Sequence, residues 1–115
     1  GLAVLREVVS QGLPERARRL GAEIRREIES WNLPVVQGVR GLGLLLGIGL
    51  NPEMVAAPEG KTIASVVVEA LRQEGLLSVP AGPETVRLLP PLNVSEEEIQ
   101  QALAIIRRVL KTYAK

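Results

Sequence analysis

One segment stands out in this 115-residue chain: Val86-Arg87-Leu88-Leu89-Pro90-Pro91-Leu92, followed at once by Asn93-Val94-Ser95-Glu96-Glu97-Glu98-Ile99. Its first half is an apolar run typical of a β-strand, and the two prolines end that run because proline cannot donate to a strand ladder. Its second half starts a helix, since Ser95 can serve as the N-cap and Glu98 completes a capping box. We therefore expect a short strand that leads directly into a helix.

Arg87 is the one charged residue of the apolar run. Strand alternation places it with Thr85 and Leu89 on one face, opposite Val86 and Leu88. A charge embedded in an apolar strand needs a partner, because an unpaired buried charge is costly. The planar guanidinium suits a carboxylate, which makes Arg87 the candidate for an anion contact. An internal ion pair with a glutamate, or a charge that protects an edge strand from aggregation, would explain it equally well.

The rest of the chain alternates between helical and strand-like patterns. Apolar residues at helical spacing predict four helices, over about 2–12, 14–31, 61–74 and 95–111. Short apolar runs bounded by glycine and proline predict strands over 35–40, 44–50, 76–79 and 85–89, the first two joined by Gly41-Leu42-Gly43 as a hairpin. This order predicts an α+β fold with a small, mainly antiparallel sheet of three to four strands and helices packed on one face.

Composition limits the chain to a single domain over residues 1–115. Hydrophobic residues make up 46% of it, which is enough for one core. A length of 115 residues is too short for two ordinary domains. The net charge is +1, and Trp31 and Tyr113 are the only aromatic residues, so little is available for stacking on bases. No apolar run approaches the length of a membrane span. We expect neither a nucleic acid nor a membrane as partner.

The chain contains no cysteine, no histidine and no aspartate. Their absence excludes the usual zinc sites, disulfides, and Ser/His/Asp or Cys/His nucleophile systems, and the lack of cysteine fits a cytoplasmic location. The three lysines, Lys61, Lys111 and Lys115, lie at a helix start or near the C-terminal end, whereas a Schiff-base lysine needs a desolvated pocket. We expect no catalytic, cofactor-binding or metal-binding residue in this chain.

The glycine-rich run Gly38-Val39-Arg40-Gly41-Leu42-Gly43 invites comparison with phosphate-binding loops. A dinucleotide-binding loop opens a helix and a P-loop ends in Lys-Ser or Lys-Thr, whereas this run leads into an apolar strand without that ending. We therefore expect no phosphate site here. Along the second predicted strand, Gly43, Gly47 and Gly49 leave one face nearly bare, which indicates close approach of a helix, another backbone or a ligand.

Two ordered segments resemble the class III, pyridoxal-phosphate-dependent aminotransferases. Residues Val39-Arg40-Gly41-Leu42-Gly43-Leu44-Leu45-Leu46-Gly47-Ile48 are similar to that family's VRG-x-GLMLGI segment. Gly75-Leu76-Leu77, then 86–92 and 95–99, resemble its C-terminal GLL … VLRFLPPL … EEI ending. Within the family, the segments are most similar to the acetylornithine aminotransferases, which are close to the ornithine aminotransferases. The likeness covers nearly the whole chain.

The resemblance implies that residues 1–115 are the C-terminal small domain of such an enzyme, a homodimer acting on amino acids and 2-oxo acids, as in arginine biosynthesis. A large domain absent here would supply the Schiff-base lysine, the aspartate that pairs with the pyridine nitrogen, and most phosphate contacts. Arg87 would contact a substrate carboxylate or pair with an active-site glutamate between turnovers, and Arg40 would be structural. The isolated chain would be inactive and would expose apolar surface. The alternative is a stand-alone module that binds an amino acid or a partner protein.

Overall fold

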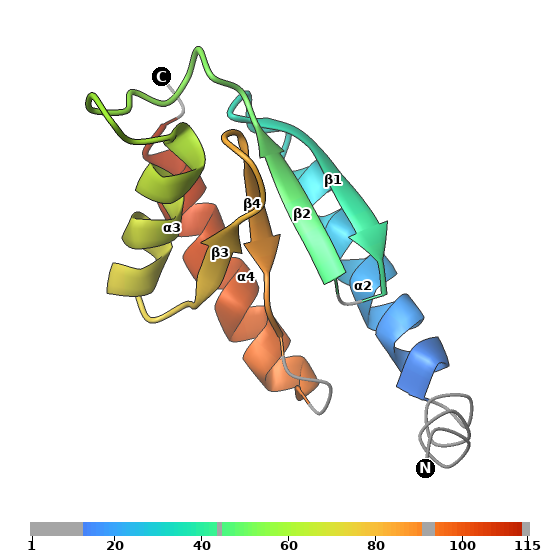
Figure 1. The fold of residues 1–115 in the computed structure, drawn as a ribbon. Helices are drawn as coiled ribbons and strands as arrows, with labels where there is room; N and C mark the ends of the chain where they lie inside the picture. Colours follow the sequence, from blue (N-terminus) through green and yellow to red (C-terminus); the bar gives the residue numbers. More distant parts are fainter. Residues whose placement is uncertain (1–12, 44, 91–93, 114–115) are drawn as a thin grey trace, which may run out of the picture.

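The computed structural model describes residues 13–43, 45–90 and 94–113 (Figure 1). The helix expected over residues 2–12 lies outside them. The described residues form three helices and four strands, in the order α2 (Leu13–Ser30), β1 (Val36–Leu42), β2 (Leu45–Leu50), α3 (Ile63–Gln73), β3 (Ser78–Pro80), β4 (Thr85–Leu88) and α4 (Glu96–Lys111). The α+β class expected from the sequence is confirmed.

The four strands form one antiparallel sheet in the order β1-β2-β4-β3. Two hairpins, β1 with β2 and β3 with β4, are joined through the central β2–β4 pair. Consequently β1 and β3 are the edge strands and β4 is internal. The first hairpin extends further than expected, since Leu42 still pairs with Leu45 and the positive φ of Gly41, 128°, lies inside the ladder.

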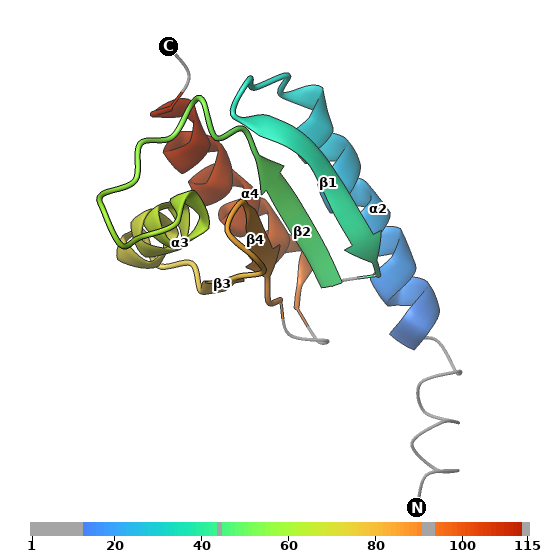
Figure 2. The same ribbon diagram turned by 45° about the horizontal axis from the view of Figure 1, so that its top comes forward.

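The helices cover one face of the sheet. Figures 1 and 2 both place α2 behind β1 and α4 behind β4, while α3 packs against β3, β4 and α4. Burial alternates along the strands accordingly: Leu46, Ile48 and Leu50 of β2 are buried between the sheet and the helices. The buried hydrophobic residues of the described part of the chain belong to one cluster.

Local signals place the helices where the sequence predicted them. The capping box of α4 is formed, with the Glu98 amide donating to Ser95 Oγ (3.0 Å) and the Ser95 amide donating to Glu98 Oε1 (2.9 Å). On α2, Leu20, Ile24 and Ile28 form the buried stripe. This stripe determines which side of α2 faces the sheet.

Strand β3 begins later than expected, at Ser78 instead of Leu76. The reason is the end of α3, where Gly75 adopts a φ of 97° and the Leu76 amide donates back to the Leu71 carbonyl (2.9 Å). This is the hydrogen-bonding pattern of a helix C-terminal motif, and it takes Leu76 out of the strand.

Close approach of a helix to the hairpin occurs at Gly43, the residue just before the second predicted strand. A Cβ on Gly21 of α2 would overlap the carbonyl oxygen of Gly43, so the helix touches hairpin backbone there. Gly47 and Gly49 lie on the opposite face, away from the helices. The helices therefore do not explain these two glycines, which leave the uncovered side of the sheet without side chains at the centre of β2.

Candidate functional site

The sheet has one face that none of the described helices covers. The residues facing this way alternate with the buried ones along each strand. We call this surface the open face; it consists of Gly38 and Arg40 on β1, Leu45, Gly47 and Gly49 on β2, Thr85 and Arg87 on β4, and Val79 on β3.

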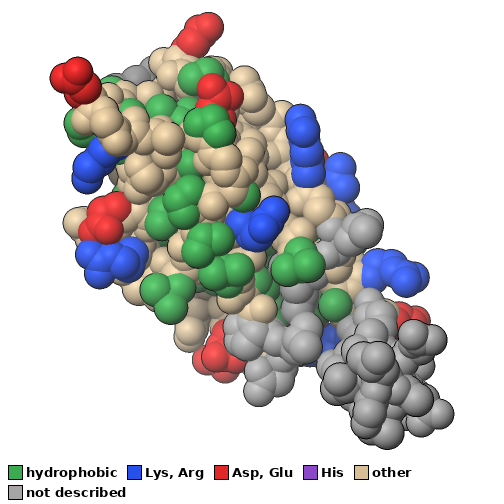
Figure 3. Space-filling model, viewed as in Figure 1, with side chains coloured by type: hydrophobic (Ala, Val, Ile, Leu, Met, Phe, Trp, Pro, Cys, Tyr) green, Lys and Arg blue, Asp and Glu red, His purple; other side chains and the backbone are tan. Residues whose placement is uncertain are grey.

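Hydrophobic side chains gather on this side of the molecule. Figure 3 shows them over β3 and β4 and over the start of β2, with acidic side chains toward the margins. The exposed large hydrophobic residues found among the described residues are Leu45 (68% exposed), Leu77 (70%), Val79 (38%) and Leu89 (48%), and alternation places all four on the open face or its border. Exposed apolar residues grouped in this way are typical of a surface that another protein part covers.

Arg87 lies in the middle of this surface. Its side chain is exposed, while Val86 and Leu88 on either side are buried, so the facing predicted by strand alternation is confirmed. The premise that this charge is buried was wrong in this structure, because the helices cover only the other face. The Arg87 guanidinium is therefore exposed to solvent in this chain.

The two structural explanations for Arg87 do not hold in the described part of the chain. Its three ion pairs join Arg25 to Glu29, Arg72 to Glu69 and Arg108 to Glu74, and Arg87 takes part in none of them. Nor does Arg87 protect a sheet edge, because β4 is flanked by β2 and β3. An exposed guanidinium that takes part in none of these ion pairs is left available to an anion.

The strand register places a second arginine in the same row. Arg40 pairs with Gly47, Gly47 pairs with Arg87, and Arg87 pairs with Val79. Residues directly opposite one another in antiparallel strands point to the same face, so both guanidiniums project from the open face with a residue lacking a side chain between them. The sequence carried no local signal for this pair, because it depends on β2 lying beside β4.

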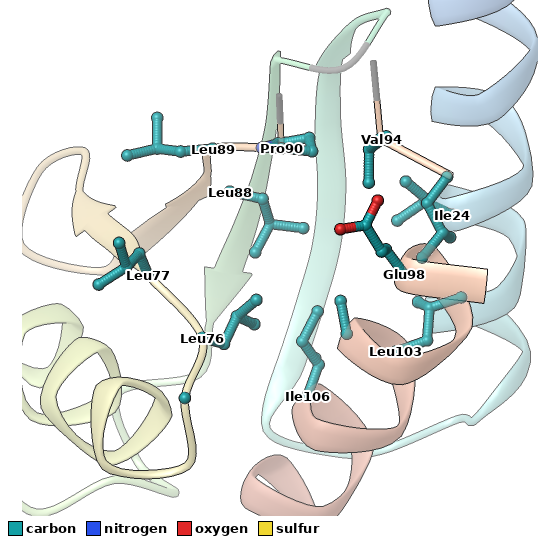
Figure 4. Close-up of a pocket in the computed structure, with 13 residues that line it drawn as sticks. Ile24, Leu76, Leu77, Leu88, Leu89, Pro90, Val94, Glu98, Leu103 and Ile106 are labelled. Carbon is teal, nitrogen blue, oxygen red and sulfur yellow. The ribbon is translucent and has the colours of Figure 1, made fainter. Parts of the chain in front are cut away.

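A cavity of about 300 Å³ opens between the end of β4 and the start of α4 (Figure 4). Its labelled wall is almost entirely apolar, with the Glu98 carboxylate as the polar exception. That carboxylate already accepts the Ser95 amide, which holds the pKa of Glu98 below its usual value. A cavity that offers a polar substrate little besides the carboxylate of the α4 capping box is poorly suited to orient it, so we place the candidate site on the open face.

The lysines in the described residues do not fit an attachment site for a carbonyl cofactor. Lys61 is exposed before α3, and Lys111 is exposed in the last turn of α4. A lysine that forms a Schiff base needs a desolvated pocket, and neither of these side chains lies in one. The described residues also contain no cluster of three or more acidic, histidine or cysteine side chains that could hold a metal. No helix among them is long and apolar enough to cross a membrane.

Comparison with known proteins gives a consistent result. The family "Aminotransferase class-III" matches residues 1–110. An acetylornithine aminotransferase of Mycobacterium leprae is 41% identical over 109 residues, covering 95% of this chain and 25% of that protein. A LysW-aminoadipate semialdehyde transaminase of Deinococcus radiodurans is 37% identical over 111 residues, covering 96% of this chain and 24% of that protein.

The fold has a counterpart among solved structures. The crystal structure of an acetylornithine aminotransferase from Elizabethkingia anophelis superposes with a TM-score of 0.77 at 33% identity, covering 96% of this chain and 28% of that one. The chain therefore spans about a quarter of the length of the relatives it matches.

Proposed function

The chain belongs to the class III aminotransferase family, and we propose that it is the C-terminal small domain of an enzyme that transfers amino groups between acetylornithine-type amino acids and 2-oxo acids. The observation that carries this proposal is the family match over residues 1–110, joined to a fold shared with an acetylornithine aminotransferase. A cytoplasmic enzyme of arginine biosynthesis is the setting that fits these relatives best.

The task of Arg87 in this proposal is to hold a substrate carboxylate. Its exposed position on the open face, without an ion pair in the described part of the chain, supports that task. The planar guanidinium can donate two parallel hydrogen bonds to a carboxylate, which fixes the orientation of the substrate as well as its position. The substrate's amino group would then be directed toward the reacting centre.

The family implies pyridoxal phosphate in the full-length enzyme, where this cofactor supplies the electron sink for amino-group transfer. The residues described here do not fit its attachment, because Lys61 and Lys111 are exposed and the chain has no aspartate to pair with a pyridine nitrogen. We assign cofactor binding to the remaining three quarters or so of the relatives' length. The isolated chain would then neither bind the cofactor in a stoichiometric manner nor transaminate.

The open face would pack against that remaining part, the large domain, in an enzyme that works as a homodimer. Its exposed hydrophobic residues support a covered surface. The alternative, a stand-alone binding module, is not favoured because the relatives are about four times as long as the chain.

The test is to express the complete reading frame and assay transfer of the amino group from acetylornithine to a 2-oxo acid. Arg87→Gln should lower kcat/KM roughly 10- to 150-fold, since a hydrogen bond to a charged group contributes about 1.5–3 kcal/mol. Arg107→Gln, which changes an exposed arginine of α4, is the matched control and should keep wild-type kinetics.

Two outcomes would contradict the proposal. One is a complete reading frame that begins near Leu2 and yields a 115-residue product which binds an amino acid through Arg87. The other is a borohydride-trapped pyridoxal phosphate adduct, at one equivalent, on a single lysine of the isolated chain.

A further inference from the structure

Arg40 and Arg87 stand on the same row of the open face with Gly47 between them. Neighbouring strands are about 4.8 Å apart, so the Cα atoms of the two arginines are roughly 10 Å apart. Both side chains are exposed, and neither takes part in the three ion pairs of the described residues. The open face thus carries two cations rather than one.

The residues next to this row have short side chains or none. Gly38 pairs with Gly49, and Gly49 pairs with Thr85, so the neighbouring row offers only one short side chain across three strands. Hydrophobic side chains stand higher around it, at Leu45 and Val79. The Thr85 methyl lies over Gly47, 3.0 Å from where a Cβ on that glycine would stand, whereas a Cβ on Gly38 would have nothing within 4 Å. An element that covers this face can therefore lower a side chain at Gly38, on the same strand as Arg40, and approach the strand backbone there.

Covering the face changes what both arginines require. A guanidinium that loses its water must gain an acceptor, because a buried unpaired charge is strongly unfavourable. The proposed function gives Arg87 an acceptor, the substrate carboxylate, which arrives and leaves in each turnover. Arg40 lies two strands away on the edge strand β1 and needs an acceptor that is present throughout.

We propose that Arg40 is a docking residue that binds a carboxylate side chain of the large domain and so holds the open face against it, whereas Arg87 is left for substrate. This inference rests on the proposed function for the identity of the covering part. The partner surface is defined by complementarity: apolar where it meets Leu45 and Val79, with a glutamate or aspartate opposite Arg40. Because the space over Gly38 is open, that carboxylate can reach Arg40 from the β1 side without displacing Arg87.

Arginine labelling with phenylglyoxal in the full-length enzyme, followed by peptide mass spectrometry, tests the division of roles. Arg40 should be protected at least tenfold relative to the isolated 115-residue chain, with or without substrate. Acetylornithine should slow the labelling of Arg87 further, whether or not a glutamate of the enzyme pairs with it between turnovers, and should leave the labelling of Arg40 unchanged. Arg107 on α4 serves as the internal reference and should react at the same rate throughout.

Substitution separates ion pairing from simple coverage. Arg40→Gln should make the melting temperature of the full-length enzyme lower and less dependent on salt, while KM for acetylornithine stays within about twofold of wild type; Arg40→Lys should restore part of the loss. Labelling of Arg40 as fast as Arg107 would overturn the proposal. So would a tenfold rise in KM for Arg40→Gln with unchanged stability, which would make Arg40 a substrate contact.

These experiments distinguish failure of the docking role of Arg40 from failure of the proposed function. A full-length protein without aminotransferase activity but with Arg40 protected in the absence of substrate would reject the proposed function and keep the docking role. An active enzyme with Arg40 unprotected would do the opposite.

Discussion

The two faces of the sheet are made by the same strands but carry different kinds of information. Leu45 and Leu46 are neighbours on β2, and their exposed fractions are 68% and 2%. On the covered face, side chains interlock with three helices in one cluster. On the open face, two arginines, three glycines and a threonine are set among exposed hydrophobic residues. Stability of the fold depends on the first face, and we assign recognition to the second.

The sharpest test of this contrast exchanges the same residue type on the two faces. Leu46→Ala should lower the free energy of unfolding of the 115-residue chain by about 2–5 kcal/mol, because it leaves a cavity in the core. Leu45→Ala should change it by no more than about 0.5 kcal/mol. Urea denaturation followed by circular dichroism measures both. Equal losses in the two variants would mean that the open face is covered in the isolated chain.

Glycines on the two faces should also respond differently. Gly21→Ala should destabilise the chain by about 1–3 kcal/mol, because a Cβ there would overlap the Gly43 carbonyl and push α2 from the hairpin. Gly38→Ala has nothing within 4 Å of its Cβ and should stabilise the chain by about 0.4–1 kcal/mol through the unfolded state. The same denaturation experiment compares them, and a tolerated Gly21→Ala would show that the helix can move away.

Self-association should depend on the open face and the exposed hydrophobic residues at its border. We expect the isolated chain to associate, because its exposed hydrophobic residues lack their covering partner. Leu77→Glu should weaken association about tenfold, or about 1.4 kcal/mol, in sedimentation velocity. Ala104→Glu adds the same charge to an exposed position of α4 and should leave association unchanged. A monomeric wild-type chain at high concentration would contradict this prediction.

The smallest expected effect concerns the first turn of α4, at the rim of the covered layer. Ser95→Ala should destabilise the chain by about 1 kcal/mol, because the Glu98 amide loses its acceptor. Hydrogen bonds from the Ser95 amide and hydroxyl hold the pKa of the Glu98 carboxyl below its usual value. The stability that the charged Glu98 carboxylate contributes is therefore complete above about pH 4.3. It is lost as the pH falls further.

Glu98→Gln is the control for that titration, because it keeps an acceptor but cannot be protonated. The stability difference between wild type and Glu98→Gln should shrink as the pH is lowered through the acidic range in thermal unfolding. A difference that is constant from pH 6 to pH 3 would contradict the assignment to Glu98.

The sequence predicted most of the elements because their signals are local. The capping box at Ser95, the stripe of α2 and the alternation around Arg87 each need only a few neighbouring residues to be recognised. Strand β3 was placed too early because the helix-ending hydrogen bond of Leu76 competes with strand formation, and the apolar pattern does not distinguish them.

The candidate site was predicted only in part. Alternation gave the direction of Arg87 relative to its neighbours, but whether that direction is covered depends on where the helices pack. The resemblance implied a structural role for Arg40, and no local pattern indicates that β2 separates it from Arg87 by a single glycine. That neighbourhood is a property of the strand order.

The strand order also has a consequence for how the domain folds. Each hairpin closes a short loop, whereas the central pair joins Gly47 to Arg87 across 40 positions (87 minus 47). Contacts that close long loops form late, because chain entropy opposes them until other contacts exist. We expect the two hairpins to form first and their union to be rate-limiting. Arg40 and Arg87 would then become neighbours only at that last step. A partly folded intermediate with separate hairpins would not present the two guanidiniums on one surface.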